Sequence, residues 1–316
     1  MAILVYTESE NNKFKKSALE ALSYGKALGK KMNESVTCLS INCADLNELK
    51  QHGSDKIIDV QNPSLEKFTS KNYAAAIHQI VKEENIKIII LSSSTNSKYL
   101  GADLSGKLES AFVSNVVELP SGLSPFLVKR TCYTNKAFST TEIKSETKII
   151  SVSSNSFGIF ESPTESDIKQ INIEIESSDL TIKKIDKQTG AVTIADADIV
   201  VSGGRGLKGP ENWHLIENLA NVLGAATACS KPVSDLGWRP HSEHVGQTGK
   251  PVASNLYIAI GISGAIQHLA GINASKVKVV INNDPEAPFF KAADYGIVGD
   301  AFEVVPELIE KLKKRG

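Results

Sequence analysis

The chain has 316 residues, of which 41% are hydrophobic and 22% charged, and its formal net charge is −1. This length favours two domains, and this composition is typical of a globular protein that buries a substantial core. The nearly balanced charge gives no reason to expect nucleic acid or an anionic membrane surface as a partner. Apolar runs stay well short of the roughly 18 residues of a membrane span, so no membrane insertion is predicted.

The first predicted strand, residues 3–6, starts almost at Met1, so we expect no leader peptide and a cytoplasmic location. The cysteines form no CxxC pair and are dispersed along the chain, which predicts reduced, buried thiols and no metal site. They are Cys38, Cys43, Cys132 and Cys229.

Short β-branched runs alternate with amphipathic segments in the N-terminal half. This alternation predicts a parallel sheet with right-handed crossovers, whose strands are apolar because helices cover both faces. The predicted strands are residues 3–6, 35–41, 56–60 and 86–92, and the predicted helices are residues 16–32, 44–52 and 73–84.

Strand patterns then follow one another without helices between them, which predicts an antiparallel extension of the first sheet. A polar stretch at residues 177–195 has weak periodicity, and we place the boundary between two domains there, at 1–193 and 194–316. The strands predicted for the extension are residues 126–134, 137–143, 148–152 and 171–176.

Strand–helix alternation resumes in the C-terminal half and predicts a second parallel sheet. Its predicted strands are residues 198–202, 225–229, 256–260, 277–281 and 295–298, and its predicted helices are residues 211–223, 265–270 and 306–314.

Open parallel sheets bind ligands at the carboxyl ends of their strands, and the two halves differ at those ends. The first strand of the chain runs into residues 7–12, a turn that has no glycine and carries Glu8 and Glu10. Two carboxylates would repel a phosphate, so the first domain is predicted to be a scaffold without a nucleotide.

The strands of the second half end instead in glycine, hydroxyl or amide groups. Glycine lets the main chain approach a diphosphate, and the amide groups that open a following helix favour an anion. This pattern predicts a phosphate-bearing cofactor. The strand ends concerned are residues 203–206, 230–231, 261–264, Asn282 and Asp300.

Two other motifs do not meet their requirements. Residues 246–251 are too short for a P-loop, and Pro251 stands where the metal-binding hydroxyl belongs. His241 and His244 lie three residues apart rather than four, so they are interpreted as loop residues and not as a zinc motif. Without a nucleophile elbow or an acid–base pair, no catalytic residue is predicted, which favours a holder of a cofactor over an enzyme.

Several segments resemble the electron-transfer flavoprotein alpha-subunit family in order and spacing, namely residues 201–208, 245–250, 257–271, 282–299 and 304–307. The resemblance implies an α/β fold of two doubly wound domains: a nucleotide-hydrolase-like scaffold with the antiparallel extension, and a parallel-sheet FAD-binding domain. It also implies a beta subunit that helps to cover the flavin and that carries an AMP.

Cofactor-binding residues follow from the resemblance, position by position. Arg205 and the turn Ser263-Gly264-Ala265 would meet the diphosphate, and Asn282 and Asp300 the adenosine side. Thr248 would offer its hydroxyl to N5 of the flavin, and His268 would lie near the N1–C2=O edge. The other residues expected around the flavin are Ser230, Lys231, Val245, Gly246, Gln247, Ile266 and Gln267.

One position departs from the family. Lys231 stands where relatives usually have arginine, and lysine lacks the planar guanidinium and loses its charge more easily on burial. We therefore expect this chain to stabilise added negative charge on the flavin less than its relatives do, and in a more pH-dependent way.

The implied function is a bacterial electron carrier of fatty acid β-oxidation. It would accept electrons from dehydrogenases such as acyl-CoA dehydrogenases and pass them to a quinone-linked oxidoreductase or another acceptor. Two alternatives stay open: an NADH-oxidising bifurcating flavoprotein subunit, and a non-redox nucleotide-binding module. A count of flavins per heterodimer separates the first alternative, and a colourless preparation would favour the second.

Overall fold

The computed structural model describes residues 2–133, 135–175, 180, 182–184, 194 and 197–314. The chain forms two compact units. One consists of Met1–Cys132 and Phe138–Asp186, and the other of Lys187–Gly316 together with the short stretch Tyr133–Ala137.

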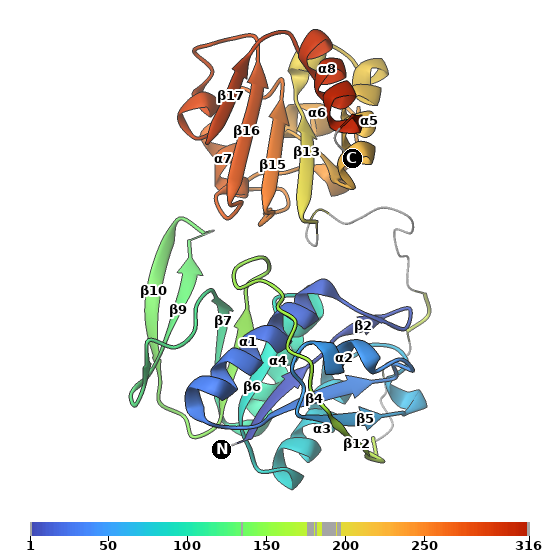
Figure 1. Cartoon of the computed structure of the whole chain (residues 1–316), viewed down its shortest axis with the longest axis vertical. Helices are drawn as coiled ribbons and strands as arrows, with labels where there is room; N and C mark the ends of the chain where they lie inside the picture. The colour runs from blue at the N-terminus through green and yellow to red at the C-terminus, as the bar shows by residue number, and fades with distance from the viewer. Residues whose placement is uncertain are drawn as a thin grey trace. The chain divides into compact units, whose positions relative to one another are not determined.

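The first unit is built on one large sheet with the strand order β10-β9-β7-β11-β6-β1-β4-β5-β12, and β8 pairs with β9 (Figure 1). The seven strands from β7 to β12 in this order are parallel, and β9 pairs antiparallel with β7. The strands are β1 (Ala2–Tyr6), β4 (Val36–Ile41), β5 (Lys56–Val60), β6 (Ile86–Ser92), β7 (Ala111–Val116), β8 (Gly122–Leu123), β9 (Phe126–Cys132), β10 (Ala137–Ile143), β11 (Lys148–Val152) and β12 (Asp167–Gln170), with a small separate hairpin of β2 (Ser9–Glu10) and β3 (Lys13–Phe14).

Helices cover both faces of this sheet. Alternate residues of β1 point to opposite faces, so Ile3 and Val5 join the core under α1, whereas Leu4 and Tyr6 join the core under α3 and α4. All four side chains are buried. The helices are α1 (Lys16–Met32), α2 (Asn47–Gln51), α3 (Ser70–Glu83) and α4 (Thr95–Leu108).

The predicted antiparallel extension is correct for β9 and wrong for the strand at 148–152. That strand, β11, lies between β6 and β7 and is parallel to both. Four of its five residues are buried, as a central strand covered on both faces requires. The strand predicted at 171–176 is also misplaced: β12 ends at Gln170 and pairs parallel with β5, residues 171–175 have no regular structure, and residue 176 lies outside the described part of the chain.

The sequence analysis assigned no element between residues 92 and 126, where the structure has α4 and β7. The buried face of α4 consists of Ser97, Leu100, Gly101 and Leu104. Their spacing is helical, but a serine and a glycine weaken the hydrophobic pattern. Strand β7 contains Asn115 at a φ of 60°, which interrupts a regular strand pattern.

A buried carboxylate lies where β1 ends. The carboxylate of Glu8 accepts from three donors: Lys15 Nζ at 2.8 Å and Asn96 Nδ2 at 3.1 Å donate to Oε1, and Ser94 Oγ donates to Oε2 at 2.5 Å. Glu8 is 4% exposed. The carboxyl edge of the first sheet is therefore closed around a negative charge of the chain itself.

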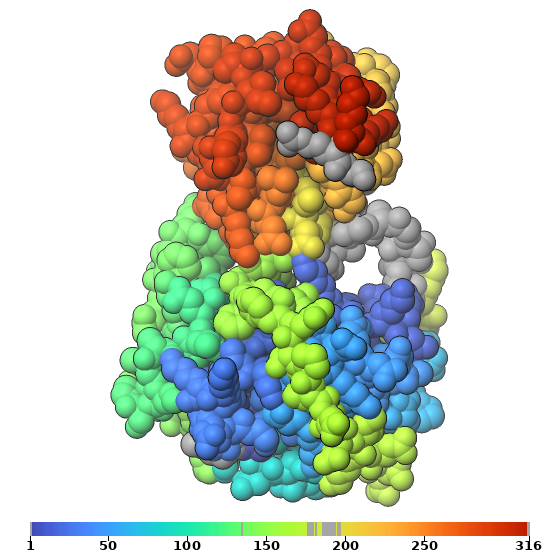
Figure 2. All heavy atoms as spheres, in the orientation of Figure 1, coloured from blue at the N-terminus to red at the C-terminus, as the bar shows by residue number. Residues whose placement is uncertain are grey.

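A second buried carboxylate fixes the long connection from β11 to β12. Oε1 of Glu20, on α1, accepts the backbone N–H groups of Phe157 and Gly158 at 2.8 and 2.9 Å, and Oε2 accepts that of Asn155 at 2.8 Å. Figure 2 shows this connection, in yellow-green, running over the blue surface of the N-terminal elements. The first part of the connection is thus held by one acidic side chain, and backbone bonds from Ser162 to Gln51 and from Thr164 to Lys50 hold its later part.

The second unit contains a five-stranded parallel sheet with the order β14-β13-β15-β16-β17 (Figure 1). Helices α5 and α8 pack on one face, and α7 lies against the other. The predicted strands all form, and α8 begins five residues earlier than predicted. The strands are β13 (Ile199–Gly203), β14 (Ala226–Cys229), β15 (Leu256–Ile260), β16 (Val277–Asn282) and β17 (Tyr295–Val298); the helices are α5 (His214–Leu223), α6 (Lys231–Asp235), α7 (Ile266–Ile272) and α8 (Ala301–Lys313).

We predict that Glu20→Gln lowers the free energy of unfolding by about 3 kcal/mol, because an amide NH₂ would face a backbone N–H that now donates to a carboxylate. Urea denaturation of the full chain measures the change. Glu165→Gln, an exposed carboxylate of the same connection, is the matched control and should leave the midpoint unchanged. Equal midpoints for the two variants would contradict this role of Glu20.

Candidate functional site

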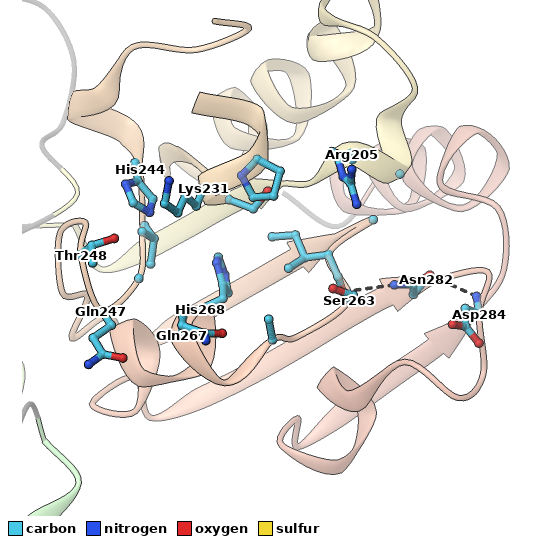
Figure 3. A pocket seen from close by; sticks show the side chains of 18 residues that line it. Arg205, Lys231, His244, Gln247, Thr248, Ser263, Gln267, His268, Asn282 and Asp284 are labelled. Atoms are coloured by element: carbon cyan, nitrogen blue, oxygen red, sulfur yellow. Dashed lines mark hydrogen bonds between the residues drawn. The ribbon is translucent and has the colours of Figure 1, made fainter. Parts of the chain in front are cut away.

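A cavity of ≈ 590 Å³ opens at the carboxyl ends of the second unit's sheet (Figure 3). The turns after β13, β14, β15 and β16 line it, together with the loop at residues 244–248 and the start of α7. This is the edge at which a parallel sheet presents a ligand. The lining residues are Arg205, Gly206, Ser230, Lys231, Pro232, His244, Val245, Gly246, Gln247, Thr248, Gly261, Ile262, Ser263, Ala265, Gln267, His268, Asn282 and Asp284.

The floor of the cavity depends on main chain packed against main chain. The N–H of Gly204 donates to the carbonyl of Ile260 at 2.9 Å, and that of Gly206 to Gly261 at 3.1 Å. A Cβ on Gly204 would lie 2.1 Å from the carbonyl oxygen of Gly261, which has a φ of +63°. Only glycine allows the turns after β13 and β15 to approach this closely.

A second glycine contact explains why one predicted residue does not line the cavity. Gly264 has a φ of +85°, and a Cβ there would lie 2.5 Å from the backbone nitrogen of Phe289. The glycine is thus packed against the segment after β16, while its neighbours Ser263 and Ala265 face the cavity. Its sequence signal was a phosphate-binding glycine, but its contacts here are those of a packing glycine.

His268 is a buried, neutral imidazole at the cavity wall. Its Nε2 lies 2.9 Å from the hydroxyl of Tyr257, and its Nδ1 is buried without a hydrogen-bond partner among the described residues. Burial, with a smaller contribution from neighbouring His244, lowers the pKa of His268 to about 4 against an opposing effect of the Val245 backbone. The ring is therefore uncharged at neutral pH.

His244 is a lining residue that the sequence analysis interpreted as part of a loop. It is 2% exposed, its Nδ1 has no hydrogen-bond partner among the described residues, and its ring lies 5.2 Å from that of His241. Burial, followed by His241 and Lys231, lowers the pKa of His244. The weak signal that could have found it is its position directly before the segment 245–250.

Lys231 is the cationic group at the end of the cavity where His244 and His268 lie, and an ion pair partly neutralises its charge. Lys231 opens α6, and its Nζ lies 2.6 Å from Oδ2 of Asp235, one helical turn further on. The two side chains are 55% and 56% exposed, so solvent screens the pair. The charge that Lys231 offers to the cavity is thus smaller than that of an isolated lysine.

The opposite end of the cavity carries Arg205, Ser263, Asn282 and Asp284 (Figure 3). The amide of Asn282 is occupied by the backbone, because Nδ2 donates to the carbonyl of Ile262 at 3.1 Å and Oδ1 accepts from the N–H of Asp284 at 3.1 Å. Asn282 therefore shapes the turn after β16. The charged groups at this end of the cavity are the guanidinium of Arg205 and the carboxylate of Asp284.

The structure brings most of the predicted cofactor residues to one cavity but not all. Gly264, Ile266 and Asp300 do not line it; Ile266 is 76% exposed, and Asp300 caps α8 by accepting from the N–H of Phe302 at 2.9 Å. Their predicted role stays a prediction. Six lining residues were not among the individually predicted cofactor-binding residues, although Gly206, Gly261 and Ile262 lie in the predicted strand-end turns: Gly206, Pro232, His244, Gly261, Ile262 and Asp284.

The donor set fits a large cofactor with a polar ring and a phosphate. The cavity volume lies within the range of small-molecule sites. Two orphaned imidazole nitrogens lie at one end, and a guanidinium lies at the other. Among the described residues, no group of three or more potential ligands could hold a metal ion, and no helix is long and apolar enough to cross a membrane.

A chain with two α/β units and a donor-lined cavity at the carboxyl edge of a parallel sheet is of the class that holds a nucleotide cofactor. Residues 3–181 match the electron transfer flavoprotein domain, and residues 193–273 match the electron transfer flavoprotein FAD-binding domain. The chain belongs to the electron transfer flavoprotein family and corresponds to its alpha subunit.

Relatives named electron transfer flavoprotein subunit alpha match along nearly the whole chain. The protein of Thermoanaerobacterium thermosaccharolyticum is 36% identical, over 99% of this chain and 98% of its own length. That of Bacillus subtilis is 33% identical, over 99% and 97%. That of Pseudomonas aeruginosa is 35% identical, over 98% and 99%. The family and the FAD-binding domain together establish an electron-transfer flavoprotein role.

We predict that His268 makes the protein less stable as the pH falls from 6.5 to about 4. In this window the unfolded chain binds a proton on this imidazole and the folded chain does not, which costs up to about 3 kcal/mol at the acid end. Urea denaturation as a function of pH measures the slope. His268→Asn should flatten it, whereas His214→Asn, a change of an exposed histidine on α5, should not. Equal slopes in wild type and His268→Asn would show that the ring is not buried neutral.

Proposed function

We propose that this chain is the FAD-holding subunit of an electron carrier and that the cavity at residues 205–284 is its flavin site. The observation that carries the proposal is the distribution of donors: imidazole, hydroxyl and ammonium groups at one end, and a guanidinium at the other. A flavin dinucleotide has the same division between a polar ring system and a diphosphate. When bound, FAD would supply the redox chemistry.

The residues of the first end would orient the ring. His244 and His268 offer neutral imidazoles whose Nδ1 atoms have no hydrogen-bond partner in the described part of the chain, and the exposed Thr248 offers a hydroxyl. Donors placed where negative charge develops stabilise that charge most when they are held rigidly beforehand. The packing of Gly246 against Gly271, where a Cβ would lie 2.6 Å from the facing Cα, supplies such rigidity to the loop.

The residues of the second end would hold the remainder of the cofactor. Arg205 extends from the glycine turn after β13, and its guanidinium makes no hydrogen bond to the described residues that would divert it from a phosphate. Asp284 could accept from ribose hydroxyls, as could Asp300, which the sequence places on the same side. Asp284 is our addition to the site, and Asp300 keeps its predicted role.

The partner we propose is a beta subunit that covers part of the flavin and carries AMP. The closed edge of the first sheet supports an AMP site outside this chain, because the buried carboxylate of Glu8 already takes the donors of this edge and would repel a phosphate. Dehydrogenases as donors, a quinone-linked oxidoreductase as acceptor, a part in fatty acid β-oxidation and a cytoplasmic location remain proposals based on the sequence. We expect no substrate turnover by this chain alone.

Co-expression of the full chain with its presumed beta subunit tests the assignment. We expect a yellow heterodimer with a flavin absorption spectrum and one FAD per pair. Two FAD per pair would favour the bifurcating alternative, and a colourless pair that takes up no added FAD would contradict the proposal.

Arg205→Ala should weaken FAD binding about tenfold, since a charged hydrogen bond to a phosphate contributes about 1.5 kcal/mol or more.

We predict that Asp235→Asn raises the midpoint potential for the first electron by ~40 mV, because it releases the charge of Lys231 toward the cavity and solvent limits the gain to about 1 kcal/mol. Lys231→Gln should shift the potential in the opposite direction. Lys231→Arg keeps the charge and should leave the potential close to that of the wild type. A spectroelectrochemical titration of the holoprotein measures all three. Unchanged potentials in Asp235→Asn and Lys231→Gln would remove Lys231 from the flavin site.

A further inference from the structure

A buried polar string runs beneath the cavity, from β15 to α7. Tyr257 is fully buried and does not line the cavity, and its hydroxyl lies 2.9 Å from Nε2 of His268. Ser202 is fully buried on the neighbouring strand. The hydroxyl of Ser202 is buried and has no hydrogen-bond partner among the described residues, so His268 is the hydrogen-bond partner of the Tyr257 hydroxyl.

The order of the hydrogens along this string follows from which groups are neutral. Burial raises the pKa of Tyr257 above its usual range, so the phenol keeps its one hydrogen. A neutral imidazole has one nitrogen with a free lone pair, and that nitrogen is a stronger acceptor than a serine hydroxyl. Tyr257 therefore donates to Nε2 of His268, and the hydrogen of the imidazole lies on Nδ1.

The surroundings of Nδ1 agree with this order. Nδ1 makes no hydrogen bond of ordinary length, which leaves its hydrogen for a ligand in the cavity that His268 lines.

We propose that Tyr257 is a positioning residue: it fixes His268 in the tautomer with its hydrogen on Nδ1, so that an uncharged imidazole donates a hydrogen bond to an acceptor atom of the bound cofactor. The cofactor part rests on the proposed function. The tautomer part does not, because the string is complete within this chain. A neutral donor gives the ligand a directed hydrogen bond without placing a buried charge beside it.

The tautomer is measured on the full chain without FAD, by NMR of protein labelled with ¹⁵N on histidine. The signals of His268 are identified by their absence in His268→Asn. We expect a protonated Nδ1 and an unprotonated Nε2 in the wild type, and a mixture of both tautomers in Tyr257→Phe. A protonated Nε2 in the wild type, or unchanged signals in Tyr257→Phe, would overturn the proposal.

A matched control separates positioning from stability. Tyr73→Phe also removes a buried hydroxyl, which donates to the carbonyl of Leu65 at 2.8 Å in the first unit. We expect both variants to lose similar stability. Only Tyr257→Phe should change the nitrogen signals of His268.

The affinity of the heterodimer for added FAD tests the cofactor part of the proposal. We expect the Kd of Tyr257→Phe to rise about fivefold to tenfold over the wild type, the effect of one misdirected hydrogen bond, and that of Tyr73→Phe to stay unchanged. Equal affinities in wild type and Tyr257→Phe would overturn the positioning role. A wild-type heterodimer that binds no FAD would instead overturn the proposed function, and the nitrogen signals would then decide the tautomer assignment by themselves.

Discussion

The site depends on the approach of two turns whose main chains touch. The Gly204 and Gly261 backbones lie so close that a methyl group on Gly204 would overlap a carbonyl oxygen. This contact sets β13 and β15 side by side up to their last residues and directs Arg205 and Ser263 to the same cavity. Without it, the side chains that follow each strand would belong to separate loops. The glycines thus act first on the shape of the sheet edge and only through it on a ligand.

Desolvation is the second constraint. His244 and His268 are among the few buried polar residues described in the second unit. Each has a ring nitrogen, Nδ1, without a hydrogen-bond partner among the described residues. Unpaired buried nitrogens cost free energy, so such atoms are expected where a ligand completes the hydrogen bonds. Burial also keeps both rings neutral, which makes them directional donors or acceptors rather than point charges. The cation of this end, Lys231, is held at the surface by Asp235 instead.

The sequence predicted the second unit well because its signals are local. Each strand is a short apolar run, and each ends in glycine or a polar residue, so the edge that carries the site is visible without any long-range information. Most of the predicted cofactor residues line one cavity for this reason. His244 was not predicted, because its importance comes from the way its loop lies against the cavity. Asp284 was not predicted, because it lies two residues beyond Asn282, where the strand pattern has already ended. Tyr257 was seen only as part of an apolar strand, since its hydroxyl has meaning only beside His268.

The first unit was harder because its order in space differs from its order in sequence. Nothing local to residues 148–152 distinguishes an inserted central strand from an extension, since its apolar run suits both. The insertion becomes reasonable only once α4 and β7 are known, because they leave β6 and β7 apart with a gap of one strand between them.

The contrast between the two sheets then follows from charge. Both are parallel sheets with helices on two faces, and both present the carboxyl ends of their strands. In the first unit, the edge closes around Glu8, whose carboxylate draws a lysine, a serine and an asparagine inward. In the second unit, the edge has glycine turns and imidazoles whose Nδ1 atoms have no hydrogen-bond partner among the described residues, so a cavity stays open there. The same architecture therefore serves as a scaffold where the polar groups of the sheet edge hydrogen-bond to one another. It serves as a binding site where the sheet edge has polar groups that a ligand can bind.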